Sequence, residues 1–396
     1  MSSVVELERA SDSGRRPLTR CTGDARAFLT TSWGRRPTLH RSDDPVGFAD
    51  LLTLDEVDRI LSTMSLRTPS FRLVKAGGQI PESAYTRSGT TGSRPVSGMA
   101  DPARVFGLFE GGATIVLQGL HRYHEPVTRF CRELEVKLGH PCQANAYITP
   151  AGAQGLELHE DPHDVFVLQA FGRKSWEVHE APGEPEREPL RAEIVPGDCI
   201  YMPTGTPHAA STQRSLSGHL TIGVHVVSWR DVLRQAMKVV EADPALGEPI
   251  PAGWPSDPEA FARDLREHLG RAGSALAAVD ANAIADARLE RFLSTRLPLL
   301  RGGLVDKDAL GEITDDTRLE RRPGSICVLR TRGDRLIALL GDRRLEMPAW
   351  LEPAMRRISD APSFRLGELA DALPDPGSRS VLARRLVREG LFRPLP

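Results

Sequence analysis

The sequence is poor in lysine, cysteine and aromatic residues. Aromatic residues make up 5% of the chain, and its five cysteines are far apart with no CxxC pair. This argues against a disulfide framework or a zinc knuckle and is typical of reduced thiols in a cytoplasmic protein. A lysine inside a candidate site is unusually informative, because the 51 basic residues include only Lys75, Lys137, Lys174, Lys238 and Lys307.

Charge and hydropathy narrow the class of protein. The formal net charge is −2, which argues against a protein whose main task is to neutralise nucleic-acid phosphates. No run approaches the roughly 18 apolar residues of a membrane helix, and the charged stretch 1–16 lacks the apolar core of a signal peptide. We therefore expect a cytoplasmic protein. Its 396 residues, 40% of them hydrophobic, suffice for two or three packed domains.

Hydrophobic patterning divides the chain into regions. Residues 1–23 are polar and predict a frayed or disordered N-terminus, and helical spacing follows within 24–62. The segment 80–100, rich in Gly, Ser, Thr and Pro, predicts a loop, and 126–138 predicts a helix. From 142 to 228, runs of period two separated by tight turns predict a small β-sandwich or barrel. Its expected strands are 143–149, 164–170, 175–179, 192–195, 199–202 and 219–227.

The chain returns to helical patterning after Trp229. From about residue 300, the expected strands 326–331 and 335–340 alternate with helices near 353–358 and 379–389. A β-centred first part is therefore followed by helices and by a mixed C-terminal part.

The strongest chemical signal is Leu158-His159-Glu160-Asp161, within the β-rich region. Residues i and i+2 of an extended segment face the same way, so His159 and Asp161 can bind one ion. Further on, a Pro-Gly-Asp turn leads into a short strand, and His208 lies at the exit of that strand. Two histidines and one carboxylate form the facial triad that leaves positions open on Fe(II). The open positions suit a chelating co-substrate and O₂.

Three further side chains suit a dicarboxylate co-substrate. Lys174 lies one strand beyond the metal motif, where an inward-pointing lysine would neutralise the distal carboxylate of 2-oxoglutarate in a dry barrel. Asn145 and Tyr147 share one face of the strand 143–149 and can hydrogen-bond the co-substrate. The alternative for Lys174 is an exposed cation in the turn after Gly172-Arg173.

Other titratable residues have simpler explanations. We expect His163 and His179 at the surface or the barrel rim, His219 in the core or near the site, and Cys199 as inert packing. The C-terminal arginines leave a local charge of +4 against Glu389, and we expect a solvated helix face there rather than a nucleic-acid surface. These arginines are Arg379, Arg384, Arg385, Arg388 and Arg393.

Several motifs together resemble the JmjC-type ribosomal oxygenases. The resemblance rests on the segments 143–150, 159–161, 164–169, 172–176, the Pro-Gly-Asp turn at 196–198 and 219–223, with weaker likeness at 28–37, 116–121, 229–231 and 386–391. It implies an α+β chain whose core is a double-stranded β-helix of the jelly-roll, cupin or JmjC type. It also implies a catalytic domain at 24–228, a helical dimerisation domain at 229–300 and a winged-helix-like domain at 301–396.

The resemblance implies roles residue by residue. His159, Asp161 and His208 would bind iron, Lys174 would pair with the 2-oxoglutarate carboxylate, and Asn145 and Tyr147 would line the site. The sequence departs from the family pattern at Leu158 and Glu160, where relatives often have proline and an aromatic residue, and in an extra Ser217-Gly218 before His219. Glu160 would either favour a cationic substrate side chain or simply be solvated.

The implied reaction is hydroxylation of an amino-acid side chain in a protein or peptide by Fe(II), 2-oxoglutarate and O₂. The implied substrate is a ribosomal protein, modified at the β-carbon of Arg or His, and the implied assembly is a homodimer without sequence-specific nucleic-acid binding. One alternative is tailoring of a ribosomally made peptide or a free amino acid. The alternatives of another class are a zinc cupin that assists hydrolysis or isomerisation and a non-catalytic scaffold that binds ribosomes or RNA.

Overall fold

The computed structural model describes residues 16–44, 46–153, 157–180, 188–211, 215–296, 299–359 and 361–395. The disorder expected at 1–15 lies outside the described residues. The chain divides into two compact units, Met1–Val226 and Val227–Pro396.

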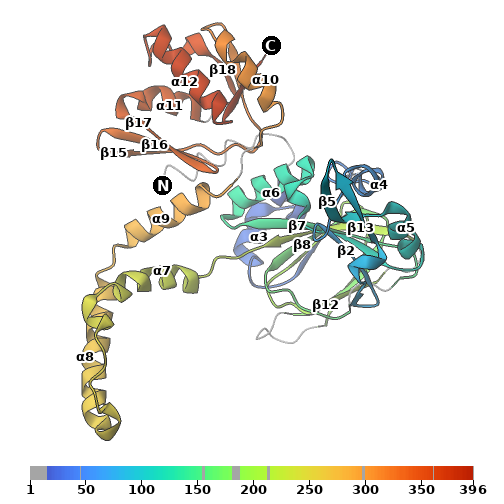
Figure 1. Ribbon diagram of the computed structural model, residues 1–396, viewed down its shortest axis with the longest axis horizontal. Helices are drawn as coiled ribbons and strands as arrows, with labels where there is room; N and C mark the ends of the chain where they lie inside the picture. Colours follow the sequence, from blue (N-terminus) through green and yellow to red (C-terminus); the bar gives the residue numbers. More distant parts are fainter. Residues whose placement is uncertain are drawn as a thin grey trace. The chain divides into compact units, whose positions relative to one another are not determined.

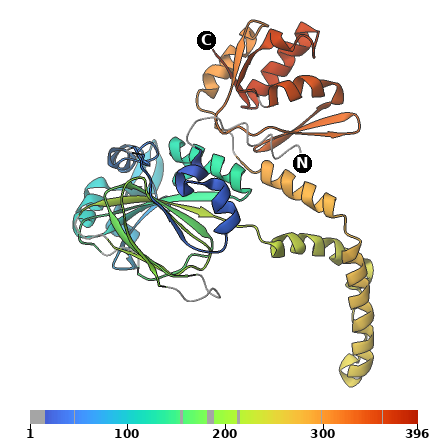
Figure 2. The ribbon, with the colours of Figure 1, turned by 180° about the vertical axis from the view of Figure 1, so that it is seen from behind.

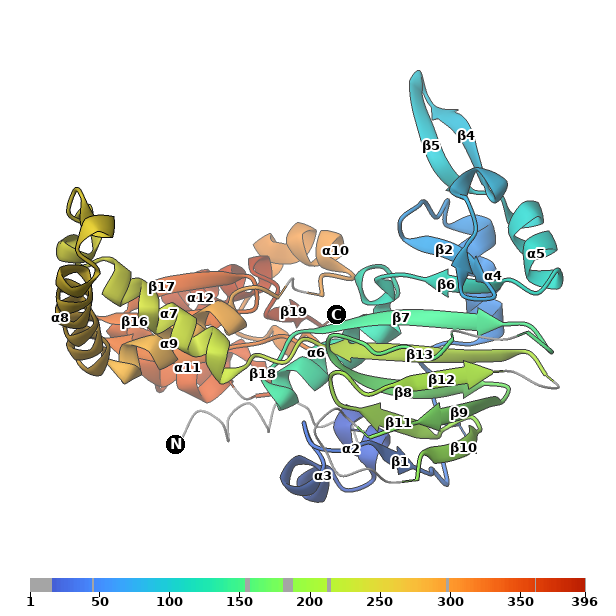
Figure 3. The ribbon, with the colours of Figure 1, turned by 90° about the horizontal axis from the view of Figure 1, so that it is seen from below.

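The first unit is a double-stranded β-helix, as predicted, with two sheets that form its walls (Figures 1 and 3). Its strands are β1 (Thr38–His40), β2 (Phe71–Lys75), β3 (Gly78–Gln79), β6 (Thr114–Leu117), β7 (Cys142–Thr149), β8 (Asp164–Phe171), β9 (Lys174–Val178), β10 (Leu190–Ile194), β11 (Cys199–Met202), β12 (His208–Ser211) and β13 (Ser217–Val224). The larger sheet has the order β1-β11-β8-β13-β7-β6-β2-β3, and the smaller has the order β10-β9-β12.

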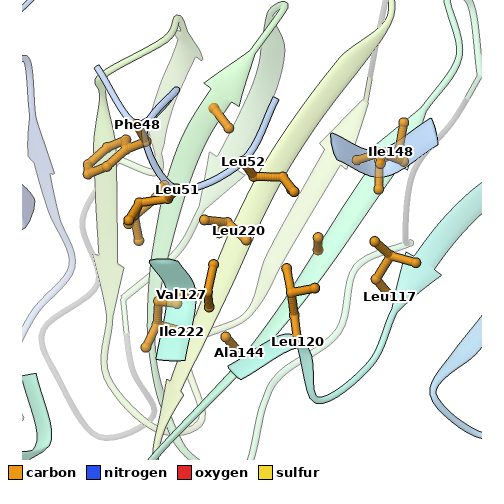
Figure 4. Packing of buried hydrophobic residues seen from close by; sticks show 14 of the residues in the cluster. Phe48, Leu51, Leu52, Leu117, Leu120, Val127, Ala144, Ile148, Leu220 and Ile222 are labelled. Atoms are coloured by element: carbon orange, nitrogen blue, oxygen red, sulfur yellow. The ribbon is translucent and has the colours of Figure 1, made fainter. Parts of the chain in front are cut away.

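Helices cover the outer face of the larger sheet. They are α2 (Pro17–Thr22), α3 (Ala25–Thr31), α4 (Leu54–Thr63), α5 (Pro102–Glu110) and α6 (Glu125–Leu138). Val127 of α6 and Leu52, which lies just before α4, pack against Ala144 and Leu220 of the sheet in one hydrophobic core (Figure 4). Because the even-numbered residues of β7 face this core, the odd-numbered ones face the barrel interior. This alternation positions the candidate site.

Two expectations for this unit were wrong. Residues 17–22 form helix α2 instead of a frayed end, because Leu18 and Cys21 are buried in the core. The segment 80–100 contains a hairpin of β4 (Thr86–Thr91) and β5 (Arg94–Ala100) instead of a loop. The hairpin projects from the unit (Figure 3), so most of its side chains are exposed and its sequence lacks the apolar alternation of a half-buried strand.

The extra Ser217-Gly218 is absorbed within β13. The register of β13 against β8 shifts between Gly218 and His219, as in a β-bulge. A Cβ at Gly218 would lie 2.0 Å from the ring of Phe171, so only glycine fits there. The extra Ser217-Gly218 therefore does not displace the strand that carries His219 from the sheet.

The second unit combines helices with two small sheets (Figure 2). Helices α7 (Trp229–Glu241), α8 (Pro258–Ala277) and α9 (Ala281–Leu293) follow one another, and α7 contacts both of the others. Farther along the chain, β14 (Arg318–Arg321), β18 (Ser363–Arg365) and β19 (Phe392–Pro394) form one sheet, and β15 (Val328–Arg332), β16 (Arg335–Leu340) and β17 (Arg343–Pro348) form the other. The short helix α10 (Gly303–Asp308) precedes these strands, and α11 (Glu352–Ser359) and α12 (Pro376–Arg388) share their apolar core.

The C-terminal arginines are largely neutralised by neighbouring carboxylates. Arg379 is buried and paired with Asp315, so the expectation of a solvated position was wrong for this residue. Arg393 pairs with Glu320. Arg385 pairs with the nearby Glu389, which also accepts a bond from Arg343. Within the described parts of the chain, no helix is long and apolar enough to cross a membrane.

Gly172, in the turn from β8 to β9, is required by both its backbone conformation and its surroundings. Its φ is +65°, and an added Cβ would lie 1.8 Å from the carbonyl oxygen of Leu216. We expect Gly172→Ala to lower the free energy of unfolding by about 3 kcal/mol or more, because the backbone must move. The matched control is Gly139→Ala, where φ is +72° and no atom lies within 4 Å. It should cost about 1 kcal/mol. Equal losses in thermal or urea unfolding would contradict this account.

Candidate functional site

The structure brings His159, Asp161 and His208 together. His159 and His208 exchange two backbone hydrogen bonds, from His159 N to His208 O (3.1 Å) and from His208 N to His159 O (2.8 Å). Asp161 follows two residues after His159, so both side chains leave the backbone on the same side. Ligand atoms of all three residues lie within 4.8 Å of one another. A single metal ion can therefore contact all three.

Backbone carbonyls fix the orientation of both imidazoles. His159 Nδ1 lies 2.7 Å from the carbonyl oxygen of Glu157, and His208 Nδ1 lies 2.9 Å from that of Thr206. A carbonyl oxygen can only accept, so each Nδ1 carries the proton and each Nε2 keeps its lone pair. Burial also lowers the pKa of His208, which favours the neutral ring that a metal requires.

Lys174 lies on the buried wall of the same pocket. Its side chain is 3% exposed, instead of projecting from a turn. Nζ lies 3.3 Å from Thr149 Oγ1, and no carboxylate from the described residues pairs with it. Burial lowers the pKa of Lys174 to about 7. A buried amine without a counter-charge is a favourable partner for an anionic ligand.

Asn145 and Tyr147 share the inner face of β7, as their spacing predicts. Tyr147 lines the pocket and stacks on His219, with ring centroids 5.1 Å apart and an interplanar angle of 5°. Burial raises the pKa of Tyr147, although the side chains of Arg72 and Asn145 oppose the shift. The Tyr147 hydroxyl therefore stays protonated at neutral pH and can donate a hydrogen bond. Asn145 Oδ1 accepts a hydrogen bond from Gly119 N (3.0 Å), which holds the loop before α6 against the strand.

Sequence reasoning did not identify two polar residues near Lys174. Thr114 lines the pocket, and its hydroxyl oxygen lies 3.1 Å from that of Thr149, which accepts the hydrogen bond from Lys174. The alternation on β7 would have found Thr149, which shares a face with Tyr147. Thr114 comes from β6, and its place opposite Thr149 depends on strand pairing that local pattern does not reveal.

Two buried polar atoms in the pocket wall lack partners among the residues that the structure describes. They are Trp176 Nε1 and His219 Nδ1. Burial lowers the pKa of His219 well below its usual value, and Lys174 and His208 add to this effect, so the His219 ring is neutral. Unpaired buried polar atoms cost free energy. Their presence beside Lys174 indicates that the pocket accommodates a polar ligand.

Both sheets contribute to the pocket, which contains about 470 Å³ of space between atoms, including space open to solvent. Polar residues form one part of the wall, and Val165, Val167 and Met202 form an apolar part. Outside the pocket, Glu160 is exposed, and His179 is partly exposed next to Glu177. Cys199 is fully buried and burial raises its pKa, as expected for inert packing.

The part of the chain that contains the site is similar to a known protein family. Residues 120–232 match the JmjC domain family. This part of the chain is therefore similar to JmjC domains. The match spans the strands that supply His159, Asp161, Lys174 and His208 or lead directly to them.

Curated relatives and solved structures extend the likeness beyond the JmjC domain. Ribosomal oxygenase 2 of Bos taurus is 36% identical over 159 residues, which are 35% of this chain and 34% of that protein. Ribosomal oxygenase 1 of Homo sapiens is 27% identical over 308 residues, which are 68% of this chain and 46% of that protein. The chain thus spans about half or less of the length of these relatives. The solved structure of YcfD, a ribosomal oxygenase from Escherichia coli in complex with cobalt and 2-oxoglutarate, has a similar fold, with a TM-score of 0.55 and 19% identity over 95% of this chain and 99% of that one.

Proposed function

We propose that this chain is an Fe(II)- and 2-oxoglutarate-dependent oxygenase that hydroxylates an amino-acid side chain in a protein or peptide. The observation that carries the proposal is the convergence of His159, Asp161 and His208 beside the buried, uncompensated Lys174. The names of the relatives and the ligands of the YcfD structure support it. The names of these relatives support a ribosomal protein as the substrate. The resemblance of the sequence motifs further implies that the target is the β-carbon of an Arg or His side chain.

The residues fit the two groups that this reaction needs. Two neutral Nε2 atoms and one carboxylate are the donor set that non-haem Fe(II) prefers. The carbonyls that hold each Nδ1–H orient the two rings before the metal binds. In the same pocket, Lys174 provides a cation for the distal carboxylate of a dicarboxylate, and Tyr147 provides a hydrogen-bond donor.

The chain's own residues determine how the reaction is controlled. When bound, iron and 2-oxoglutarate supply with O₂ the oxidising power that converts a C–H bond into C–OH, and succinate and CO₂ are released. Lys174 would hold a proton on Nζ once a carboxylate faces it, because the opposite charge raises its pKa again. Val165, Val167 and Met202 exclude water from the apolar part of the pocket. His159 and His208 retain their Nδ1 protons and do not transfer them.

We propose the same domain division as the sequence predicts, with a helical dimerisation domain at 229–300 and a winged-helix-like domain at 301–396. Exposed apolar side chains on α7 and α8 support a homodimer, because a second copy would bury them. These side chains are Leu233, Val239, Leu265 and Leu269. A monomer in light scattering at micromolar concentration would contradict this assembly. A cytoplasmic location is proposed from the scattered, free cysteines.

The alternative functions account for fewer observations. A zinc cupin explains the metal-binding cluster but gives no role to the buried Lys174. A ribosome-binding scaffold needs neither the cluster nor the lysine. Tailoring of a peptide or an amino acid uses the same pocket and differs only in substrate. The oxygenase reaction is therefore better supported than any single substrate.

An anaerobic titration tests the reaction class. Addition of Fe(II) and then 2-oxoglutarate to the apo-protein should produce a visible charge-transfer band with one-to-one stoichiometry. Mass spectrometry of ribosomal proteins incubated with the enzyme should then show an added oxygen. If neither iron nor 2-oxoglutarate binds, the oxygenase proposal is wrong. Binding of iron without the band would contradict the role of Lys174.

A further inference from the structure

The turn between β11 and β12 holds two of the three proposed ligands at once. Gly205 N donates a hydrogen bond to the carbonyl oxygen of Asp161 (2.9 Å), and Thr206 O accepts the bond from His208 Nδ1 (2.9 Å). Thr206 N donates to Pro203 O (3.2 Å), which closes the turn. The position of this turn therefore sets the separation between the backbone of Asp161 and the ring of His208.

A buried carboxylate anchors the turn. Asp164 Oδ1 accepts hydrogen bonds from both Thr204 N (2.9 Å) and Thr204 Oγ1 (2.8 Å). Asp164 begins β8 and is 3% exposed. Because β8 is in the middle of the larger sheet, Asp164 ties the turn to a rigid strand.

The other oxygen of Asp164 connects to a different part of the fold. Asp164 Oδ2 accepts from the Tyr201 hydroxyl (2.5 Å), and the Tyr201 oxygen accepts from Gly34 N (2.7 Å). Burial raises the pKa of Tyr201, and Asp164 raises it further, so the hydroxyl keeps its proton and donates. The two oxygens of one carboxylate thus have separate partners, the metal-site turn on one side and the N-terminal segment on the other.

The partners of Asp164 make a purely structural role a poor explanation. Its hydrogen-bond donors in the described structure are neutral: a backbone N–H and two hydroxyl groups. Burial of a carboxylate costs several kcal/mol, which neutral donors offset only in part. A fold that needed only stability would be served as well by an uncharged residue. The carboxylate is, however, well suited to hold a turn with two bonds on one oxygen.

We propose that Asp164 is a positioning residue for the metal site, acting through Thr204 and the turn 203–207. This inference rests on the proposed function, because it concerns the same three ligands. Loss of the Thr204 contacts frees the turn, so that Asp161 and His208 no longer hold a fixed separation. The ligands themselves remain present, and metal affinity falls because their geometry is not fixed in advance.

The test compares variants on the two sides of Asp164. We expect Asp164→Asn to weaken Co(II) binding to the apo-protein about 10- to 100-fold, and Thr204→Val to weaken it about 3- to 10-fold with little change in Tm. Thr204→Ser should restore the wild-type Kd, because it keeps the hydroxyl. The matched control, Tyr201→Phe, removes only the contacts to Asp164 Oδ2 and Gly34 N. It should lower Tm while leaving the Co(II) Kd within about twofold.

Hydrogen exchange provides a readout independent of metal. In apo Asp164→Asn, peptides that cover 203–208 should exchange faster, and peptides that cover 165–171 should not. A wild-type Kd for Co(II) in both Asp164→Asn and Thr204→Val would overturn this proposal and leave the proposed function intact. Failure of the wild-type protein itself to bind Co(II) or Fe(II) would overturn both.

Discussion

Replacement of Asp161 by alanine is expected to weaken Fe(II) or Co(II) binding by at least about 100-fold and to abolish the charge-transfer band with 2-oxoglutarate. Asp161 is the only anion among the three proposed ligands, and its carboxylate lies 3.8 Å from Nε2 of His208. Its removal leaves two neutral nitrogens, which cannot hold a divalent cation in the same three-ligand geometry. Isothermal titration of the apo-protein under nitrogen, followed by visible absorbance, measures both effects.

The neighbouring residue provides a matched control for Asp161. Glu160→Ala removes the same charge one position away, from a side chain that is exposed and outside the pocket lining. It should leave the metal Kd within about twofold, because an exposed charge is screened by water. If the two variants lost equal affinity, general charge at the pocket mouth would explain binding, and the three-ligand geometry would not.

Replacement of Lys174 by methionine is expected to have opposite effects on 2-oxoglutarate binding and on stability. Affinity for 2-oxoglutarate should fall by about 100-fold or more, because a dicarboxylate would lose its cationic partner in a dry pocket. Metal binding should persist, since Lys174 is not among the ligands. The apo-protein, however, should become more stable by about 2 kcal/mol or more at pH 7, because the amine is buried without a counter-charge.

The difference in stability between the Lys174→Met variant and the wild type should shrink as pH rises above about 7. The pKa of Lys174 is about 7 in the folded chain and about 10.4 in an unfolded one. Between these values the unfolded chain holds the extra proton, so the stability of the wild-type apo-protein rises as pH increases from about 7 to about 10. Below about pH 7 the penalty is complete. The methionine variant should lack this rise in urea unfolding.

Arg173→Met is the matched control for the lysine variant. Arg173 is the residue before Lys174, but its side chain is exposed and pairs with Glu193 at 3.1 Å. Its removal should change neither 2-oxoglutarate affinity nor the pH profile of stability by a measurable amount. A Lys174→Met protein that bound 2-oxoglutarate normally, or that was less stable than the wild type at pH 7, would contradict the role assigned to this lysine.

The barrel and the convergence of His159 with Asp161 were accessible to sequence reasoning because both depend on local pattern. Strands such as 199–202 show period two or a short apolar run between Gly and Pro turns, and the structure has the same strand. His159 and Asp161 are two positions apart on one extended segment, so their convergence follows from strand geometry. The inward direction of Lys174 required the register of β9 against β10 and β12, which the resemblance supplied and the pattern alone did not.

The features that sequence reasoning missed depend on contacts between distant segments. The β4–β5 hairpin is held by backbone pairing between polar, exposed strands, so no hydrophobic period marks it. Helix α2 is short and appears polar in sequence, but Leu18 and Cys21 meet the barrel layer. His219 was expected in the core or near the site, and only the pairing of His219 with Tyr147 across β13 and β7 shows that it lines the pocket.

Because the chain has only five lysines, chemical modification of Lys174 can be used to follow ligand binding in the pocket. An ordinary lysine in water is almost entirely protonated at pH 7.5 and reacts slowly with electrophiles, whereas the lowered pKa of Lys174 leaves much of its amine free and nucleophilic. A reagent as small as cyanate can therefore carbamylate this side chain preferentially, and only four other lysines compete in the peptide map. A dicarboxylate bound in the pocket protects the amine, because its negative charge raises the pKa of Lys174 so that Nζ stays protonated, and because it covers the side chain. The rate of carbamylation at Lys174 thus becomes a label-based measure of ligand binding that needs neither oxygen nor turnover.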